Sequence, residues 1–286
     1  MSEAVNLREI PGITLGLPFA KYLALPGLSA SKLKHLMISP RNYRWNEDHP
    51  NLTVSGSMAL GTAAHTAILE PERFVDLYKV YEGTRRGKAW EAFQEENCYS
   101  EILTASEYAD VCGMRDAIRS HPAAARYLQN GVAEVTIQWV DPSSGRAFKG
   151  RVDWVTVVDG RLTLVDLKTT RDSSPRKFGA DAYRLGYHIQ FGLYVDGWYH
   201  LTKETPRFVV LAVESKGPFE PAAFDVPEDV LMQGHEEYMG LLTQLKECED
   251  SNTWPPRIQE EIPLTLPSWA VSDDDDLSDI GLDLSA

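Results

Sequence analysis

The segment from Gly150 to Thr170, GRVDWVTVVDGRLTLVDLKTT, constrains the fold more than any other part of the chain. It contains two apolar runs rich in β-branched residues, joined by Asp159-Gly160, a dipeptide that favours a tight hairpin turn. Asp153 lies in the first predicted strand, and Asp166 and Lys168 lie near the end of the second. Side chains two residues apart in a strand project from the same face, so we expect Asp166 and Lys168 to lie together.

This pair in an otherwise apolar strand indicates a polar site. An acid and an amine there need water, a partner or an ion, because burying either charge alone is costly. Asp153 and Asp166 offer carboxylate oxygens, the ligands that a hard cation such as Mg²⁺ prefers. Two neighbouring ions would activate water and stabilise the oxygen that leaves phosphorus, and Lys168 suits the charge that develops on a phosphate. The alternative is an ordinary salt bridge at the sheet edge, and the short pattern alone favours it.

Two further residues could complete such a site. Glu134 stands at the start of the preceding predicted strand and could join the two Asp residues through the strand meander. Gly61 and His65 are four residues apart in a helix expected over residues 57–70, so they share one face, and the imidazole could bind a metal. A histidine among small apolar neighbours is more often a core residue, and that interpretation stays open.

A helix expected from Pro175 to His200 carries Gln190 and Tyr194 at the same four-residue spacing. Gln190 could orient water or a phosphate oxygen, and Tyr194 could form a hydrogen bond beside it. The aromatic residues recur at helical spacing along this segment, which favours core packing for Tyr194.

Several basic and aromatic residues could contact nucleic acid through phosphate contacts and base stacking, although solvated loops explain them equally well. These candidates are Lys32, Arg41, Arg44, Trp45, Arg85, Arg86 and Arg151.

Size and composition are those of one large domain with room for an appended subdomain: the chain has 286 residues, 43% of them hydrophobic. No apolar run of about 18 residues predicts a membrane span. The first residues lack the basic-then-apolar order of a secretory signal. The three cysteines are far apart in sequence, which fits reduced thiols in a cytoplasm and excludes a four-thiolate iron–sulfur cluster.

The formal net charge of −14 is unusual for a protein that binds nucleic acid. It argues against broad, non-specific coating of DNA, but it leaves room for a local basic channel. Part of the negative charge comes from residues 271–286, which hold six Asp and no basic residue. We expect this acidic tail to be disordered.

The order of predicted elements is helices, a strand meander, a long helix, another strand and a last helix, and this order favours an α/β fold with a mixed central sheet flanked by helices. We expect residues 1–28 to be an irregular N-terminal segment and residues 29–270 to form the main domain.

In combination, the motifs GxxxH, Glu, Asp, DxK and QxxxY resemble the RecB-like branch of the PD-(D/E)XK nuclease superfamily. Within it, the chain is similar to the C-terminal nuclease domain of RecE (exodeoxyribonuclease VIII) and its phage-encoded relatives. The matching segments are LSASKLKHLMISPRNYRW, LGTAAHTAILEPERF, AEVTIQWVDPSSG, VDLKTT, YRLGYHIQFGLYVDGW and LPSWA.

The resemblance implies a 5′→3′ exonuclease that degrades one strand of linear duplex DNA, uses Mg²⁺ with Mn²⁺ as a substitute, and leaves a 3′ overhang for recombination by strand annealing. It also implies a two-metal mechanism, a ring-shaped homo-oligomer, a RecT-like annealing partner and a bacterial cytoplasm, with a phage or prophage origin. The site residues that it implies are the metal ligands His65, Asp153, Asp166 and the Leu167 carbonyl, the acid Glu134, the catalytic Lys168, and Gln190 and Tyr194 of the downstream helix.

Two other functions remain open from the sequence. One is an endonuclease or a Cas4-like end-processing nuclease, and the Cas4-like form is disfavoured by the absence of a cysteine cluster. The other is a non-catalytic recombination adaptor, in which the acidic tail would mimic DNA or dock on a basic partner.

Overall fold

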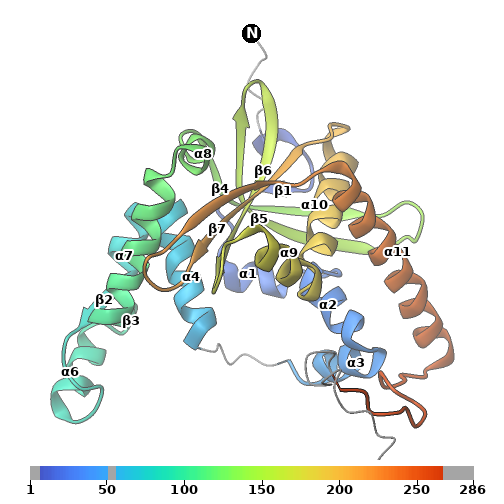
Figure 1. The fold of residues 1–286 in the computed structure, drawn as a ribbon, viewed down its shortest axis with the longest axis horizontal. Coiled ribbons are helices and arrows are strands. Elements are labelled where there is room, and N and C mark those ends of the chain that lie inside the picture. The colour runs from blue at the N-terminus through green and yellow to red at the C-terminus, as the bar shows by residue number, and fades with distance from the viewer. Residues whose placement is uncertain (1–6, 51–55, 267–286) are drawn as a thin grey trace, which may run out of the picture.

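A central sheet of six strands organises the computed structural model, which describes residues 7–50 and 56–266 (Figure 1). The strands lie in the order β1–β4–β5–β6–β7–β8. Their bounds are β1 Ile13–Thr14, β4 Gly131–Val140, β5 Ala147–Val158, β6 Arg161–Thr170, β7 Arg207–Glu214 and β8 Pro221–Asp225. β6 and β7 are parallel, and the other neighbouring pairs are antiparallel. The predicted mixed α/β fold is confirmed.

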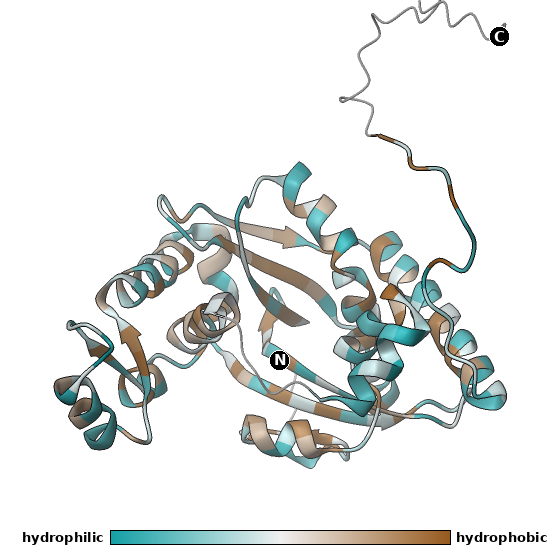
Figure 2. Cartoon of the chain, turned by 90° about the horizontal axis from the view of Figure 1, so that it is seen from below, coloured by the Kyte–Doolittle hydropathy of each residue, from teal (hydrophilic) through white to brown (hydrophobic). Residues whose placement is uncertain are grey.

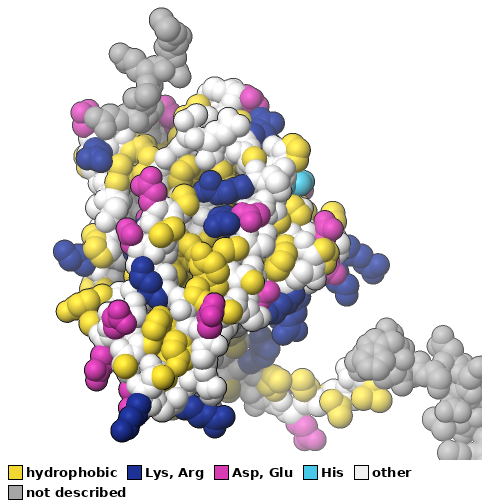
Figure 3. Space-filling view, turned by 90° about the vertical axis from the view of Figure 1, so that its left-hand side faces the viewer, with side chains coloured by type: hydrophobic (Ala, Val, Ile, Leu, Met, Phe, Trp, Pro, Cys, Tyr) yellow, Lys and Arg dark blue, Asp and Glu magenta, His cyan; other side chains and the backbone are white. Residues whose placement is uncertain are grey.

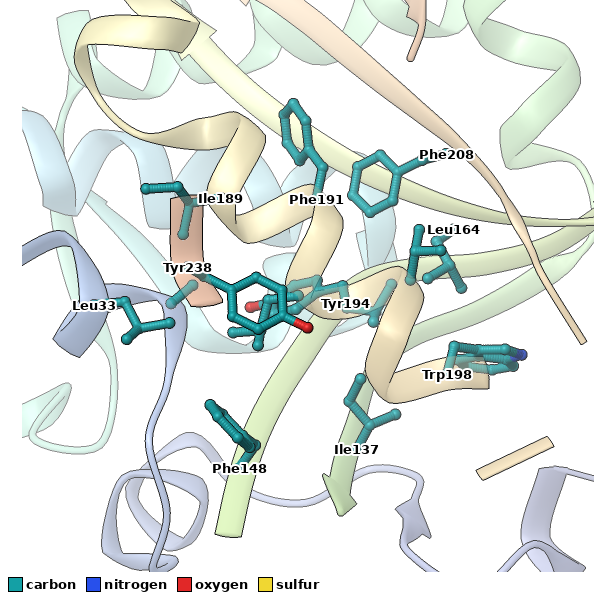
Figure 4. Close-up of a cluster of buried hydrophobic side chains, with 14 of the residues drawn as sticks. Leu33, Ile137, Phe148, Leu164, Ile189, Phe191, Tyr194, Trp198, Phe208 and Tyr238 are labelled. Carbon is teal, nitrogen blue, oxygen red and sulfur yellow. The ribbon is translucent and has the colours of Figure 1, made fainter. Parts of the chain in front are cut away.

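Both faces of this sheet are buried because its central strands carry near-continuous apolar runs, whose successive side chains point to opposite faces. Leu164 of β6 faces one cluster of buried side chains, and Val165 faces the other. Figure 4 shows the first cluster, where α10 and α11 supply aromatic residues that pack over the sheet. In the second cluster, α4 and α7 cover the opposite face. Figure 2 shows the apolar strands enclosed by helices whose polar residues face outward.

The helices are α1 Phe19–Ala24, α2 Ala30–Ile38, α3 Pro40–Asp48, α4 Gly56–Leu69, α5 Pro71–Leu77, α6 Lys88–Glu96, α7 Ala105–Ser120, α8 Pro122–Ala125, α9 Pro175–Arg184, α10 Tyr187–Thr202 and α11 Glu228–Ser251. Two short 3₁₀ turns, η1 Leu7–Glu9 and η2 Arg126–Leu128, complete the helical set. A separate parallel pair, β2 Tyr78–Tyr81 and β3 Glu101–Thr104, projects with α6 from the main body (Figure 1). None of the helices in the described ranges is long and apolar enough to cross a membrane.

The structure corrects two expectations about the helices, and it does not describe the acidic tail. The helix expected from Pro175 to His200 is two helices, because Gly186 takes the left-handed φ of 64° between α9 and α10. The segment that contains Arg41 and Trp45 is helical, since Ser39 accepts a hydrogen bond from Asn42 N and caps α3. The acidic tail lies outside the described residues.

Residues 1–28 are not irregular throughout, because β1 and α1 lie in their described part. β1 pairs with β4 at the edge of the sheet. The buried Lys149 ammonium group donates to the backbone oxygens of Tyr22, Leu23 and Leu25 at 3.1, 2.9 and 2.7 Å. These carbonyls lie at the C-terminal end of α1, where a cation is favourable, so Lys149 attaches this segment to β5.

Helices α10 and α11 approach so closely that glycine is required at their contact. A Cβ on Gly234 of α11 would lie 2.0 Å from the backbone oxygen of His188, and a Cβ on Gly192 of α10 would lie 2.8 Å from His235 N. Both are contacts with backbone, which cannot move aside as a flexible side chain could. The position of α10 against the sheet therefore depends on this contact.

We expect Gly234→Ala to lower the free energy of unfolding by about 1–3 kcal/mol, because the added methyl group forces the two helices apart. The matched control is Gly240→Ala on the same helix, where a Cβ meets nothing within 4 Å. This control should stabilise the protein by roughly 0.5–1 kcal/mol through helix propensity. Chemical denaturation of both variants measures the difference, and equal stability of the two would contradict the proposed close contact.

Candidate active site

The candidate site lies where β5 and β6 stop pairing. Their antiparallel register ends at Trp154 and Val165, whereas β6 continues to pair with β7 as far as Thr170. The last five residues of β6 therefore have one edge that no described strand covers. Asp153 reaches across this edge, where its Oδ2 atom accepts a hydrogen bond from Leu167 N at 2.8 Å.

Asp166 is the most buried charged group of the site, with a residue exposure of 1%. Gln190 Nε2 of α10 donates to Asp166 Oδ1 at 2.6 Å, and Lys168 Nζ lies 2.6 Å from Oδ2. The contact with Lys168 is an ion pair without the geometry of a hydrogen bond, so Oδ2 has no hydrogen-bond partner in the described structure. The expected proximity of Asp166 and Lys168 on one strand face is thus present.

His65 approaches from the opposite face of the sheet, on α4. Its Nδ1 atom lies 3.5 Å from Asp153 Oδ2. Burial, and secondly the positive charge of Lys168, lower the pKa of His65, so the imidazole is neutral at neutral pH. Neutral imidazole is the form that binds metals. One helical turn earlier, a Cβ on Gly61 would lie 3.3 Å from Thr169 Oγ1, so this glycine lets α4 lie close to β6.

Burial and mutual repulsion shape the charges of the site. Burial, and then the negative charge of Asp166, raise the pKa of Asp153 well above its usual value. Burial alone would lower the pKa of Lys168, but Asp166 and Asp153 outweigh it and raise that pKa, so the amine stays charged. A second positive charge at this place would relieve the repulsion between the two carboxylates.

Glu134 was expected to join Asp153 and Asp166, but its carboxylate binds an arginine instead. The register of β4 and β5 places it opposite Asp153, but this one position is not paired, and Glu134 takes the left-handed φ of 56°. Its carboxylate forms an ion pair with Arg151, which also donates to the backbone oxygen of Leu17 at 2.8 Å. Glu134 is therefore near the two Asp residues but bound to Arg151. Arg151 in turn links Glu134 to the N-terminal segment.

Tyr194 has a mixed environment. It belongs to the buried aromatic cluster in Figure 4, as expected from the periodicity of its helix, while its hydroxyl accepts a hydrogen bond from Arg151 N at 3.4 Å. Burial raises the pKa of Tyr194 well above its usual value, so the phenol remains protonated.

Lys34 on α2 is a residue that the motif analysis did not single out. Its Nζ atom donates to Gln190 Oε1 at 3.1 Å, and the ammonium groups of Lys34 and Lys168 each lie 4.8 Å from the centre of the Tyr187 ring. Lys34 thereby fixes which end of the Gln190 amide faces Asp166. Its position within LSASKLKHL was available in the sequence, but lysine on a helix usually faces solvent, and no local pattern distinguished it.

Most of the predicted DNA contacts lie apart from these residues. Lys32 pairs with Glu47 at 2.7 Å, and Arg85 is bound to Ile102 O and Glu107. Arg41, Arg44 and Trp45 line a separate cavity of about 380 Å³ beside Trp254. Arg86 is exposed in the loop before α6. On the face in Figure 3, Lys and Arg side chains are interspersed with acidic and apolar ones, without a continuous basic surface.

The donors fit the chemistry of a divalent cation, although they do not form a finished metal site. Among the described residues, no group of three or more His, Cys, Asp or Glu side chains is arranged to hold a metal ion. Asp166 Oδ2 is buried with only the Lys168 ion pair beside it, and burial together with the charge of Asp166 raises the pKa of Asp153, so a cation would stabilise both carboxylates. The Leu167 carbonyl faces the same open edge as its N–H group, because both groups of one strand residue point to the same side.

The low pKa of Lys34 generates a prediction about stability. Burial, and secondly Lys168, lower this pKa from 10.5 to about 7. The unfolded chain therefore binds more protons than the folded protein between about pH 7 and 10.5, so this group makes the protein more stable as the pH rises through that range. We expect the melting temperature of the parent, relative to Lys34→Met, to rise by several degrees from pH 6.5 to 9. A constant difference in thermal denaturation across this range would show that Lys34 titrates normally.

The comparisons with known proteins concern the fold and the family of the chain. A crystal structure of a protein from Eubacterium rectale, named "Putative exonuclease", is similar to this chain with a TM-score of 0.58 and 14% sequence identity, over 88% of this chain and 97% of that one. At this identity the likeness shows a shared fold.

Two weaker similarities carry no argument because their TM-scores are below 0.5. SSO0001 has a TM-score of 0.39 and 13% identity, over 84% of each chain. VC1899 from Vibrio cholerae has a TM-score of 0.23 and 11% identity, over 84% of this chain and 58% of that one. No curated protein matches the chain significantly.

The family comparison decides the relationship. A model described as a PDDEXK-like domain of unknown function (DUF3799) matches residues 29–262, which include the whole open edge of β6 and the helices around it. The predicted relationship to PD-(D/E)XK nucleases is thereby confirmed, and the chain belongs to the family of PDDEXK-like domains named DUF3799.

Proposed function

We propose that this protein is a divalent-metal-dependent exonuclease that degrades one strand of linear duplex DNA in the 5′→3′ direction. The observation that carries the proposal is the meeting of Asp153, the Asp166–Lys168 pair and His65 at the uncovered edge of β6. Membership of a PDDEXK-like family supports phosphodiester hydrolysis, and the RecE-like order of motifs supports the direction and the duplex substrate.

In this mechanism the residues of the chain have separate tasks. Lys168 remains charged beside Asp166, so its ammonium group can stabilise negative charge that develops on the phosphate. Gln190, oriented by Lys34, holds one oxygen of Asp166, and the other oxygen faces Lys168. When bound, Mg²⁺ would polarise the attacking water and neutralise the phosphate, held by Asp153, Asp166, His65 and the Leu167 carbonyl.

The proposal extends to the assembly and its biological role on the strength of the resemblance. It includes a second metal ion, a ring-shaped homo-oligomer, a RecT-like single-strand annealing partner and a role in homologous recombination in the cytoplasm of a bacterial or phage-infected cell. Residues 29–270 would form the nuclease domain, and the acidic tail would lie outside it.

We expect Asp166→Asn and Lys168→Met to reduce cleavage of linear duplex DNA by about a thousandfold or more, because each removes a group that acts on the transition state. The control is Lys246→Gln with Asp250→Asn, an exposed pair on α11 with a contact of 2.7 Å that resembles the Asp166–Lys168 pair in charge alone. Circular dichroism checks that all variants fold. Parental cleavage rates in either site variant would refute the assignment of the active site.

Substrate ends and ions test the reaction itself. With Mg²⁺ or Mn²⁺, the protein should release nucleotides first from 5′-labelled ends of a linear duplex, leave a 3′ overhang and spare a covalently closed circle. Ca²⁺ should permit DNA binding with little cleavage, because its larger and looser coordination misplaces the reacting groups. Nicking of the circle would instead identify an endonuclease, and DNA binding without cleavage in any of these metals would favour the adaptor role.

A further inference from the structure

A cavity of about 670 Å³ adjoins the candidate active site, within the size range of small-molecule sites. Tyr187 is common to both, since its ring lines the cavity and lies 4.8 Å from Lys168 Nζ. Gly61 and Thr169 form another wall, directly after the catalytic strand positions and one turn before His65. A group bound in this cavity would therefore lie next to whatever the Asp166–Lys168 pair acts on.

The lining is suited to an anion. Arg171 is exposed, and no described residue forms a hydrogen bond or an ion pair with its guanidinium group. Arg184 also lines the cavity and binds Asp181 at 2.8 Å, so the carboxylate of Asp181 is already neutralised. A guanidinium group that lines a cavity and binds none of the described residues is a good partner for phosphate oxygens.

The backbone adds a neutral donor. Thr170 O accepts a hydrogen bond from Ser215 N on the β7 side. Because successive strand residues direct their polar groups to alternate sides, the N–H group of Thr169 points to the uncovered edge of β6. The hydroxyl of Thr169 lies in the same wall as Gly61, where a larger residue would press on it. The cavity thus combines a cation with hydroxyl and amide donors.

The local charge differs from that of the whole chain. Residues 171–184 contain four basic residues and two acidic ones, in a chain whose net charge is −14. This segment, which supplies Arg171 and Arg184 to the cavity, is therefore net positive in an acidic chain, and a net positive segment favours anionic ligands.

We propose that this cavity binds the phosphate and sugar of the nucleotide next to the scissile bond, with Arg171 as the cation that contacts the phosphate. The proposal rests on the proposed nuclease function for the identity of the ligand, a nucleotide of the strand that is cut. It assigns Arg171, Thr169 and Tyr187 to substrate binding, and none of the three takes part in the chemical step.

The test combines a binding measurement with kinetics. In Mg²⁺-free buffer, millimolar deoxythymidine 5′-monophosphate should raise the melting temperature of the parent by a few degrees. Inorganic phosphate should give a smaller shift, and thymidine, which lacks phosphate, should give none. In Arg171→Gln, the shift with the nucleotide should disappear, whereas the control Lys246→Gln, an exposed change on α11, should keep it.

With linear duplex DNA and Mg²⁺, Arg171→Gln should raise KM about tenfold and change kcat less than about twofold, since one charged hydrogen bond to the substrate is lost. The slope of log KM against log salt concentration should fall by about one, as expected when one contact with a phosphate is lost. Thr169→Val, which removes only the hydroxyl, should shift KM in the same direction.

The outcomes separate the two proposals. Nucleotide binding that depends on Arg171, in a protein that cuts no DNA, would support the cavity and refute the nuclease. An active nuclease in which Arg171→Gln keeps both the parental KM and the parental nucleotide shift would refute the cavity and leave the nuclease standing.

Discussion

The burial of Asp166 in the central sheet is the constraint on which the site depends. A carboxylate this deep is tolerated only with partners, and the fold supplies them from distant parts of the chain. Lys168 lies two residues along the same strand, Gln190 comes from α10, and Lys34 on α2 fixes the orientation of Gln190. Removing any one of these partners leaves a buried polar group unsatisfied. The packing of α2 and α10 therefore determines how the carboxylate of Asp166 is held.

The same coupling explains why glycines matter far from the reacting groups. Gln190 can reach Asp166 only while α10 lies close to the sheet, and α10 is held there by its contact with α11 through Gly192 and Gly234. On the opposite face, Gly61 allows α4 to lie close to Thr169 and so brings His65 towards Asp153. Small residues thus set the distances between helices and sheet, and those distances set which polar groups meet.

Short sequence patterns predicted those features of the fold that depend only on neighbouring residues. The positions of Asp166 and Lys168 followed from strand alternation, and the hairpin at Asp159-Gly160 followed from turn chemistry. The break at Gly186 was missed because a glycine within an apolar helical pattern is often tolerated, and its left-handed conformation depends on how α9 packs. The ion pair of Glu134 with Arg151 was also missed, since it links two strands through side chains whose partners depend on the three-dimensional arrangement.

The early end of the β5–β6 pairing gives a physical reason for the place of the site. An uncovered strand edge exposes backbone groups that need partners, and here Asp153 meets one of them at Leu167 N. Thr169, at the same edge, lines a cavity together with Arg171, whose guanidinium group binds none of the described residues. A site for an anionic strand at this edge would satisfy the backbone, Arg171 and the charge of Lys168 together. With the proposed function, the acidic chain would need no broad basic surface, because Lys168 and Arg171 lie beside one edge of one strand.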